Sequence, residues 1–146
     1  MAVYFFTEDI AFNFNQKQIF KQWIKYIVES RDFILGDINY IFTSEDKILA
    51  INKAYLNHNY LTDIITFPYS IGKIISSDIY ICIPVVKINA QNYQQTFSDE
   101  LNRVIAHGVL HLVGFNDSTK AEEKIMRKAE DESLLVLKEM CNAKKF

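Results

Sequence analysis

The sequence has few of the residues that interrupt a chain or cross-link it. Its 146 residues include four glycines, two prolines and two cysteines. With so little Gly and Pro, no linker divides the chain, and we expect a single domain over residues 1–146. Cys82 and Cys141 form no C-x-x-C pair. Reduced thiols in a cytosolic protein are therefore favoured over a structural disulfide.

Long apolar runs and an excess of basic residues are also missing. No hydrophobic run approaches the length of a membrane span. The first residues, MAVYFFTEDIAF, carry no basic segment and include Glu8 and Asp9, which is unlike a signal peptide. We therefore expect a cytoplasmic protein with no membrane partner. The net charge of −2 excludes a generally basic nucleic-acid binder, so any RNA contact requires a local patch.

Hydrophobic periodicity predicts an α+β domain whose elements follow the order β-α-β-α-β-β-α-α-α. Strands are expected over 2–6, 37–44, 62–69 and 77–83, and helices over 15–30, 47–58, 85–95, 98–113 and 118–140. The expected N-cap residues are Asn15, Ser44 and Ser98, and either Ser118 or Thr119 with Glu122 as capping-box partner. The prediction is a small mixed sheet of about four strands that carries helices, with a metal site at the end of a central helix.

One segment, HGVLHLVGFND at residues 107–117, combines three metal-binding side chains. His107 and His111 lie four residues apart, which places both on one face of a helix. Gly114 ends that helix, and the chain can then turn so that Asp117 reaches the same ion. Three protein ligands leave a tetrahedral zinc ion one position for water, as in catalytic sites. The spacing predicts one zinc ion per chain, held by His107, His111 and Asp117; the alternative is two packed core histidines.

The spacing H-x-x-x-H-x-x-G-x-x-D also matches the ligand spacing of the metzincin peptidases. Two positions differ from that motif. Asp117 stands in place of the third His, and Gly108 stands where those peptidases carry a Glu as general base. Because the proton acceptor is missing, a metallopeptidase is the least favoured function.

The same segment resembles the signature of the YbeY endoribonucleases, the ribosomal RNA maturation factors, in which H-G-x-L-H-L-x-G-[YF]-D-H is typical. Gly108, Leu110, Leu112 and Gly114 belong to that signature. INKAYLNHNYLTDIITFPY resembles the family's L-N-x-x-Y-R…T-D-V-L-S-F-P segment, SSDIYIC its G-D-I-x-I strand, and MRKAEDESL its closing M…E helix. The positions that match in the longest of these are Asn52, Tyr55, Thr62, Asp63, Phe67 and Pro68. The resemblance spans most of the chain, from Ile38 to Leu135.

The resemblance implies a single-strand-specific, metal-dependent endoribonuclease that acts in small-subunit ribosomal RNA maturation and ribosome quality control. Its partners would be small-subunit ribosomal RNA and the ribosome or ribosome-associated proteins. Three positions depart from the family pattern: Asp117 replaces the third His, Ser77 replaces a Gly, and Leu56 replaces an Arg. The alternative is an RNA- or ribosome-associated binding protein whose metal site is structural and whose cleavage is lost, consistent with Leu56.

Site-shaping or substrate-binding roles are expected for Thr62, Asp63, Asp78, Gly108 and Gly114. The catalytic residue stays open. Phosphodiester cleavage develops negative charge that a positioned cation stabilises, and Leu56 cannot supply one. Lys53, on the same expected helix, and Arg103, one turn before His107, are the candidates.

Overall fold

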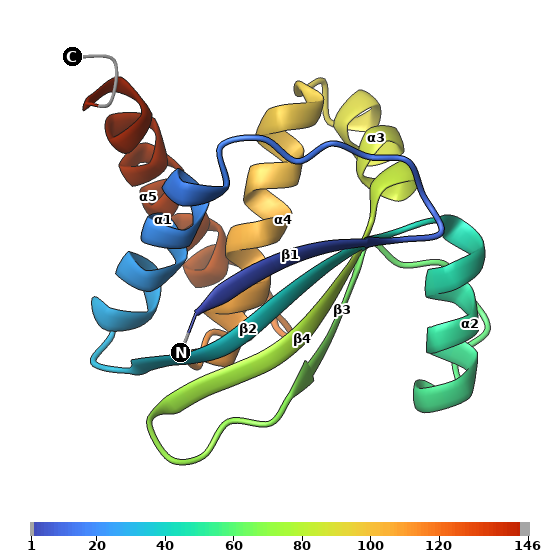
Figure 1. Ribbon diagram of the computed structural model, residues 1–146, viewed down its shortest axis with the longest axis horizontal. Helices are drawn as coiled ribbons and strands as arrows, with labels where there is room; N and C mark the ends of the chain where they lie inside the picture. Colours follow the sequence, from blue (N-terminus) through green and yellow to red (C-terminus); the bar gives the residue numbers. More distant parts are fainter. Residues whose placement is uncertain (1, 144–146) are drawn as a thin grey trace.

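The computed structural model describes residues 2–143 and contains the predicted elements in the predicted order (Figure 1). They are β1 (Val3–Glu8), α1 (Lys17–Glu29), β2 (Ile34–Thr43), α2 (Glu45–Leu56), β3 (Ile64–Pro68), β4 (Ile74–Cys82), α3 (Ile83–Asn92), α4 (Phe97–Leu112) and α5 (Lys120–Ala143). None of these helices is both long enough and apolar enough to cross a membrane. The α+β prediction is confirmed.

The sheet has four strands in the order β1-β2-β4-β3. β1 pairs in parallel with β2, and β2 pairs in parallel with β4. β3 runs antiparallel to β4. The sheet is therefore mixed, as predicted, and the start of β3 lies beside the end of β4.

The main core lies on the sheet face covered by α1, α3, α4 and α5 (Figure 1). Two buried hydrogen bonds fix how the helices lie there. The Trp23 indole N–H donates to the Ser133 carbonyl at 2.7 Å, which ties α1 to α5. The Tyr40 hydroxyl donates to the Ile105 carbonyl at 2.9 Å, which ties α4 to β2. Because both donors are fully buried, losing either acceptor would leave an unsatisfied polar group in the core.

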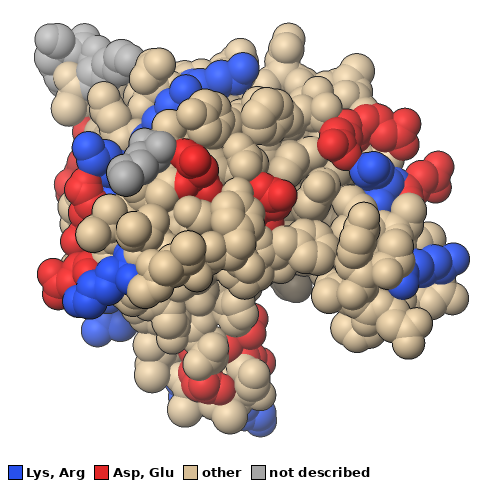
Figure 2. Space-filling view, turned by 60° about the horizontal axis from the view of Figure 1, so that its bottom comes forward, with Lys and Arg blue, Asp and Glu red and all other residues tan. Residues whose placement is uncertain are grey.

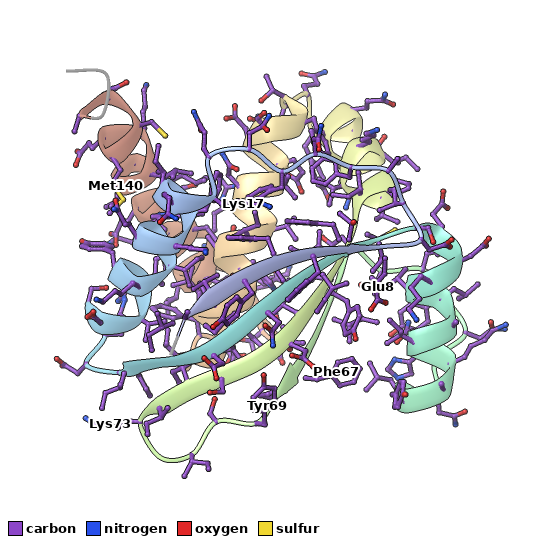
Figure 3. The ribbon with its side chains drawn as sticks, viewed as in Figure 1. Glu8, Lys17, Phe67, Tyr69, Lys73 and Met140 are labelled. Carbon is purple, nitrogen blue, oxygen red and sulfur yellow. The ribbon has the colours of Figure 1, made fainter. Side chains whose placement is uncertain are left out.

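The second face of the sheet packs against α2. A small cluster of Ile48, Ile51, Ile65 and Cys82 is buried there. At its border, Lys47 of α2 forms an ion pair with Glu8 at 3.3 Å. Tyr55 of α2 meets the Phe67 ring edge-on, with centroids 5.8 Å apart. Glu8 and Phe67 accordingly point into the space between the sheet and α2 (Figure 3).

Two of the expected helix caps are confirmed. Ser44 caps α2 by accepting a hydrogen bond from the Lys47 N–H. Thr119 and Glu122 form a reciprocal capping box before α5, since each side chain accepts from the other's backbone N–H at 3.1 and 3.0 Å. This geometry decides between the two expected caps in favour of Thr119 over Ser118.

Two other expected caps are wrong. α1 begins after Gln16, which has a positive φ of 61° and makes no side-chain cap, so Asn15 lies outside. α4 is capped by Thr96, two residues before Ser98. The earlier start has a packing reason. Phe97, the first residue of α4, packs on the core and meets Phe12 edge-on at 6.0 Å.

Candidate active site

α4 and the loop after it carry the histidine segment. The rings of His107 and His111 lie on one face of the helix, nearly parallel, with centroids 6.2 Å apart. Gly114 has a φ of 108°, a conformation that side chains rarely adopt, and its N–H bonds back to the His111 carbonyl. This turn returns the chain toward α4 and places Asp117 Oδ2 3.4 Å from His107 Nε2.

Gly108 has a packing role. A Cβ atom at this position would lie 2.9 Å from Ile64 Cδ1 and 3.4 Å from two side-chain atoms of Ile79. The missing side chain therefore lets α4 approach the β3–β4 pair closely. A glutamate here would point into the sheet and not toward His107, which is a further reason against peptidase chemistry.

α5 supplies a site residue that the sequence prediction missed. Glu130 Oε2 lies 2.8 Å from His107 Nδ1. Glu130 Oε1 accepts from Arg103 Nη1 at 2.8 Å, and Arg103 Nη2 donates to Asp131 Oδ1 at 2.6 Å. The only sequence signal was the resemblance of MRKAEDESL to a family helix. The acidic residues of this helix otherwise suggest pairs within the helix, whereas Glu130 and Asp131 pair with α4.

These contacts set the electrostatics of the site. The hydrogen bond to Glu130 raises the pKa of His107, although burial lowers it, and Asp117 and Asp63 add to the rise. Burial by itself raises the pKa of Glu130, but hydrogen bonds from His107 and Arg103 outweigh burial and hold that pKa below its ordinary value. Burial raises the pKa of Asp63, with His107 opposing.

A pocket of about 440 Å³ opens beside His107. Four of the predicted site residues line it: Asp63, Arg103, His107 and Asp117. Arg127 also lines it. Its side chain is 61% exposed, and its contact with Glu130 is 4.0 Å long. On the face drawn in Figure 2, the coloured Lys and Arg residues are scattered and form no broad basic patch.

Other predicted residues lie outside the pocket lining. The Thr62 hydroxyl bonds to the Ile64 carbonyl at 3.4 Å, beside Asp63. Asp78 lies on the second face of the sheet, where its Oδ1 accepts from the Asn39 amide at 3.0 Å and from the Tyr69 hydroxyl at 3.3 Å. Tyr69 is labelled below the sheet in Figure 3.

Lys53 is exposed in the last turn of α2 and is not among the residues that line this pocket. The Arg103 guanidinium, by contrast, lines the pocket but is already paired with two carboxylates. Neither cation is both free and at the pocket.

Two of the three predicted metal ligands lie close together. Two donors bound to one tetrahedral zinc ion at about 2.0–2.1 Å lie roughly 3.4 Å apart. His107 Nε2 and Asp117 Oδ2 have that separation, and Nδ1 of the same ring is held by a carboxylate, as is common for metal-bound histidine. His111 is exposed and is not among the residues that line the pocket. Within residues 2–143, no three His, Cys, Asp or Glu side chains converge to hold an ion.

Comparison with known proteins decides the family. The model of the family described as Endoribonuclease YbeY matches residues 3–138. The chain belongs to the YbeY endoribonuclease family. A YbeY relative from Parabacteroides distasonis is 43% identical over 141 residues, covering 97% of this chain and 99% of the relative. One from Azobacteroides pseudotrichonymphae is 46% identical over 134 residues, covering 92% and 96%.

The fold is similar to a solved structure as well. A solution structure of a protein from Thermotoga maritima matches with a TM-score of 0.60 and 27% identity, covering 90% of this chain and 88% of that one. The YbeY relatives named above carry the name of an endoribonuclease. They favour neither a binding protein that has lost cleavage nor a metallopeptidase.

Proposed function

We propose that residues 1–146 form one metal-dependent endoribonuclease domain that cuts single-stranded RNA, with small-subunit ribosomal RNA as substrate. It would act in the cytoplasm, in ribosomal RNA maturation and ribosome quality control, in contact with the ribosome or ribosome-associated proteins. Membership of the YbeY family supports the nuclease activity. The single observation that carries the site is the pairing of His107 Nε2 with Asp117 Oδ2 at 3.4 Å beside an open pocket.

The proposed cofactor is one zinc ion per chain. His107 and Asp117 would hold it together with His111, which lies one helical turn away on the same face of α4. Because the His111 side chain is exposed, it has room to change its side-chain torsions. When bound, the ion would make a water more acidic and stabilise negative charge on a phosphate.

The chain's own residues prepare this site. Gly108 sets the distance of α4 from the sheet, and Gly114 provides the turn that brings Asp117 back. Asp63 lines the pocket together with His107, and the Thr62 hydroxyl bonds to the Ile64 carbonyl beside it. Asp78 supports the sheet from the other face.

The proposed test is cleavage of a single-stranded RNA, the same RNA in a duplex, and a peptide. We expect the single strand to be cut, the duplex to be cut far less, and the peptide to stay intact. His107→Ala and Asp117→Ala should lose both zinc and cleavage. His58→Ala is the matched control, because His58 contacts Tyr60 at 3.0 Å in an exposed segment away from the pocket lining. Full zinc content and full cleavage in His107→Ala would contradict the proposal.

A cation for the transition state is proposed from Lys53 or Arg103. Lys53→Ala and Arg103→Ala separate the two, provided zinc content and melting temperature are measured first. A tenfold loss of cleavage corresponds to about 1.4 kcal/mol of transition-state stabilisation. Since Arg103 also contacts Glu130, only a loss of cleavage with zinc retained counts for its direct role.

A further inference from the structure

We propose that Glu130, braced by Arg103, is a positioning residue that fixes the His107 ring so that Nε2 faces Asp117 and the pocket. The proposal rests on the metal site proposed above and deepens it. It adds α5, the last helix of the chain, to a site that the sequence motif places wholly on α4 and the following loop.

The geometry gives Glu130 no freedom. Its side chain is 8% exposed, and each of its two oxygens has its own partner. Oε2 contacts His107 Nδ1 and Oε1 accepts from Arg103 Nη1, both at 2.8 Å. Turning the carboxylate would break both contacts at once. Charge-assisted hydrogen bonds of this length are among the stronger ones in proteins.

Arg103 is fixed in turn from its other side. Its Nη2 donates to Asp131 Oδ1 at 2.6 Å, so the planar guanidinium is held at two points by adjacent residues of α5. Arg103 and His107 are four residues apart and share a face of α4. Glu130 and Asp131 of α5 thus hold the side chains of Arg103 and His107 of α4 in place.

The contact to Glu130 also decides which His107 nitrogen is available. An ionised carboxylate only accepts hydrogen bonds, so Nδ1 must carry the hydrogen in this contact. In the neutral ring the lone pair is then on Nε2, the nitrogen 3.4 Å from Asp117 Oδ2. Carboxylate partners of this kind orient metal-bound histidines and make them better ligands.

A purely structural ion pair between α4 and α5 is the competing explanation. It differs in its consequences, because the two helices are also joined through the core, where Val104, Met126 and Ala129 are buried in one cluster. A structural role predicts a loss of stability without a change in the ring nitrogens or in zinc affinity. A positioning role predicts a change in both, even in a folded variant.

The experiment compares Glu130→Ala, Glu130→Gln and the control Glu132→Gln with the parent chain; Glu132 is exposed on α5 and does not line the pocket. The first readout is the nitrogen NMR signal of the His107 ring in zinc-free protein, at a pH where the ring is neutral. The second is zinc affinity, measured by competition with a chromophoric chelator. Melting temperature identifies any variant that is not folded.

We expect Glu130→Ala to mix the two ring tautomers and to weaken zinc binding by roughly 10–100-fold. Glu130→Gln should fall between Glu130→Ala and the parent, since an amide oxygen can still accept from Nδ1–H while the amide N–H₂ opposes Arg103. Glu132→Gln should leave the His107 signal unchanged. If Glu130→Gln also melts early, the ring signal of its folded fraction still decides the matter.

A folded Glu130→Ala variant with the parent's ring signal and zinc affinity would overturn the proposal. The outcome is separable from the function proposed above. If the parent binds zinc but cuts no RNA, the nuclease proposal fails and the positioning role stands. If the parent binds no zinc, the metal site fails, and an unchanged ring signal in Glu130→Ala then overturns the positioning role as well.

Discussion

Gly108 shows how a single absent side chain shapes the site. We predict that Gly108→Ala changes the free energy of unfolding by less than about 1 kcal/mol, because the gain in helix propensity offsets the displacement of the Ile64 side-chain end. Gly108→Glu should cost several kcal/mol, since it buries a charge against the sheet. Chemical denaturation of the two variants measures both values. A Gly108→Glu variant as stable as the parent would show that α4 does not approach the sheet closely.

Glu100 is a buried carboxylate whose ionised form lowers the stability of the folded chain. It is 6% exposed, and burial raises its pKa, with Asp63 adding to the rise and Arg103 opposing it. The unfolded chain therefore ionises Glu100 more readily than the folded one does, and stability is lost as pH rises from the unfolded pKa of 4.5 toward the folded value.

We predict that Glu100→Gln raises the free energy of unfolding at pH 7. The gain should vanish well below the unfolded pKa of 4.5, where the parent carboxyl is protonated in both states. Denaturant titrations at the two pH values measure this. Glu123→Gln, at an exposed position on the same pocket, is the matched control and should change stability little at either pH. A gain of equal size at both pH values would refute the burial explanation.

The start of α5 offers a test at the scale of one element. Thr119 and Glu122 cap each other's backbone N–H groups, whereas the neighbouring Ser118 takes no part in that capping box. Thr119→Ala is expected to lower stability by about 1 kcal/mol. Ser118→Ala should stay within about 0.5 kcal/mol of the parent. Thermal or denaturant unfolding compares the pair, and equal losses in both variants would mean that the capping box adds nothing.

The helices and strands were predictable because their patterns are local. The buried residues of α1, including Trp23, Ile24 and Ile27, repeat at helical spacing within one short segment. Helix starts were less predictable where packing competes with capping. Thr96 and Ser98 are both suitable caps, and the contact of Phe97 with the core, which no local pattern contains, selects Thr96.

At the scale of the whole molecule, the site contains residues that a local pattern predicted and residues that only tertiary packing brings there. His107 and Asp117 lie within one segment, and their spacing alone predicted that they approach each other. The same spacing predicted that His111 joins them, but within residues 2–143 no three such side chains converge. Glu130 lies 23 residues from His107 and reaches it only because α5 packs on α4. The sequence likewise indicated that Arg103 is available as a cation at the site. Its pairing with two α5 carboxylates depends on tertiary packing, which a motif does not specify.

The central claim is that this chain cuts RNA with a metal held at His107, His111 and Asp117. The most direct measurement is the rate of single-stranded RNA cleavage by chelator-treated protein as zinc is added back. We predict that chelation abolishes cleavage while the domain stays folded, since a chain of 146 residues is long enough to be stabilised by its own hydrophobic core. Activity should return and level off at one zinc per chain. Cleavage that survives complete metal removal, or that never returns when one zinc per chain is bound, would contradict the account.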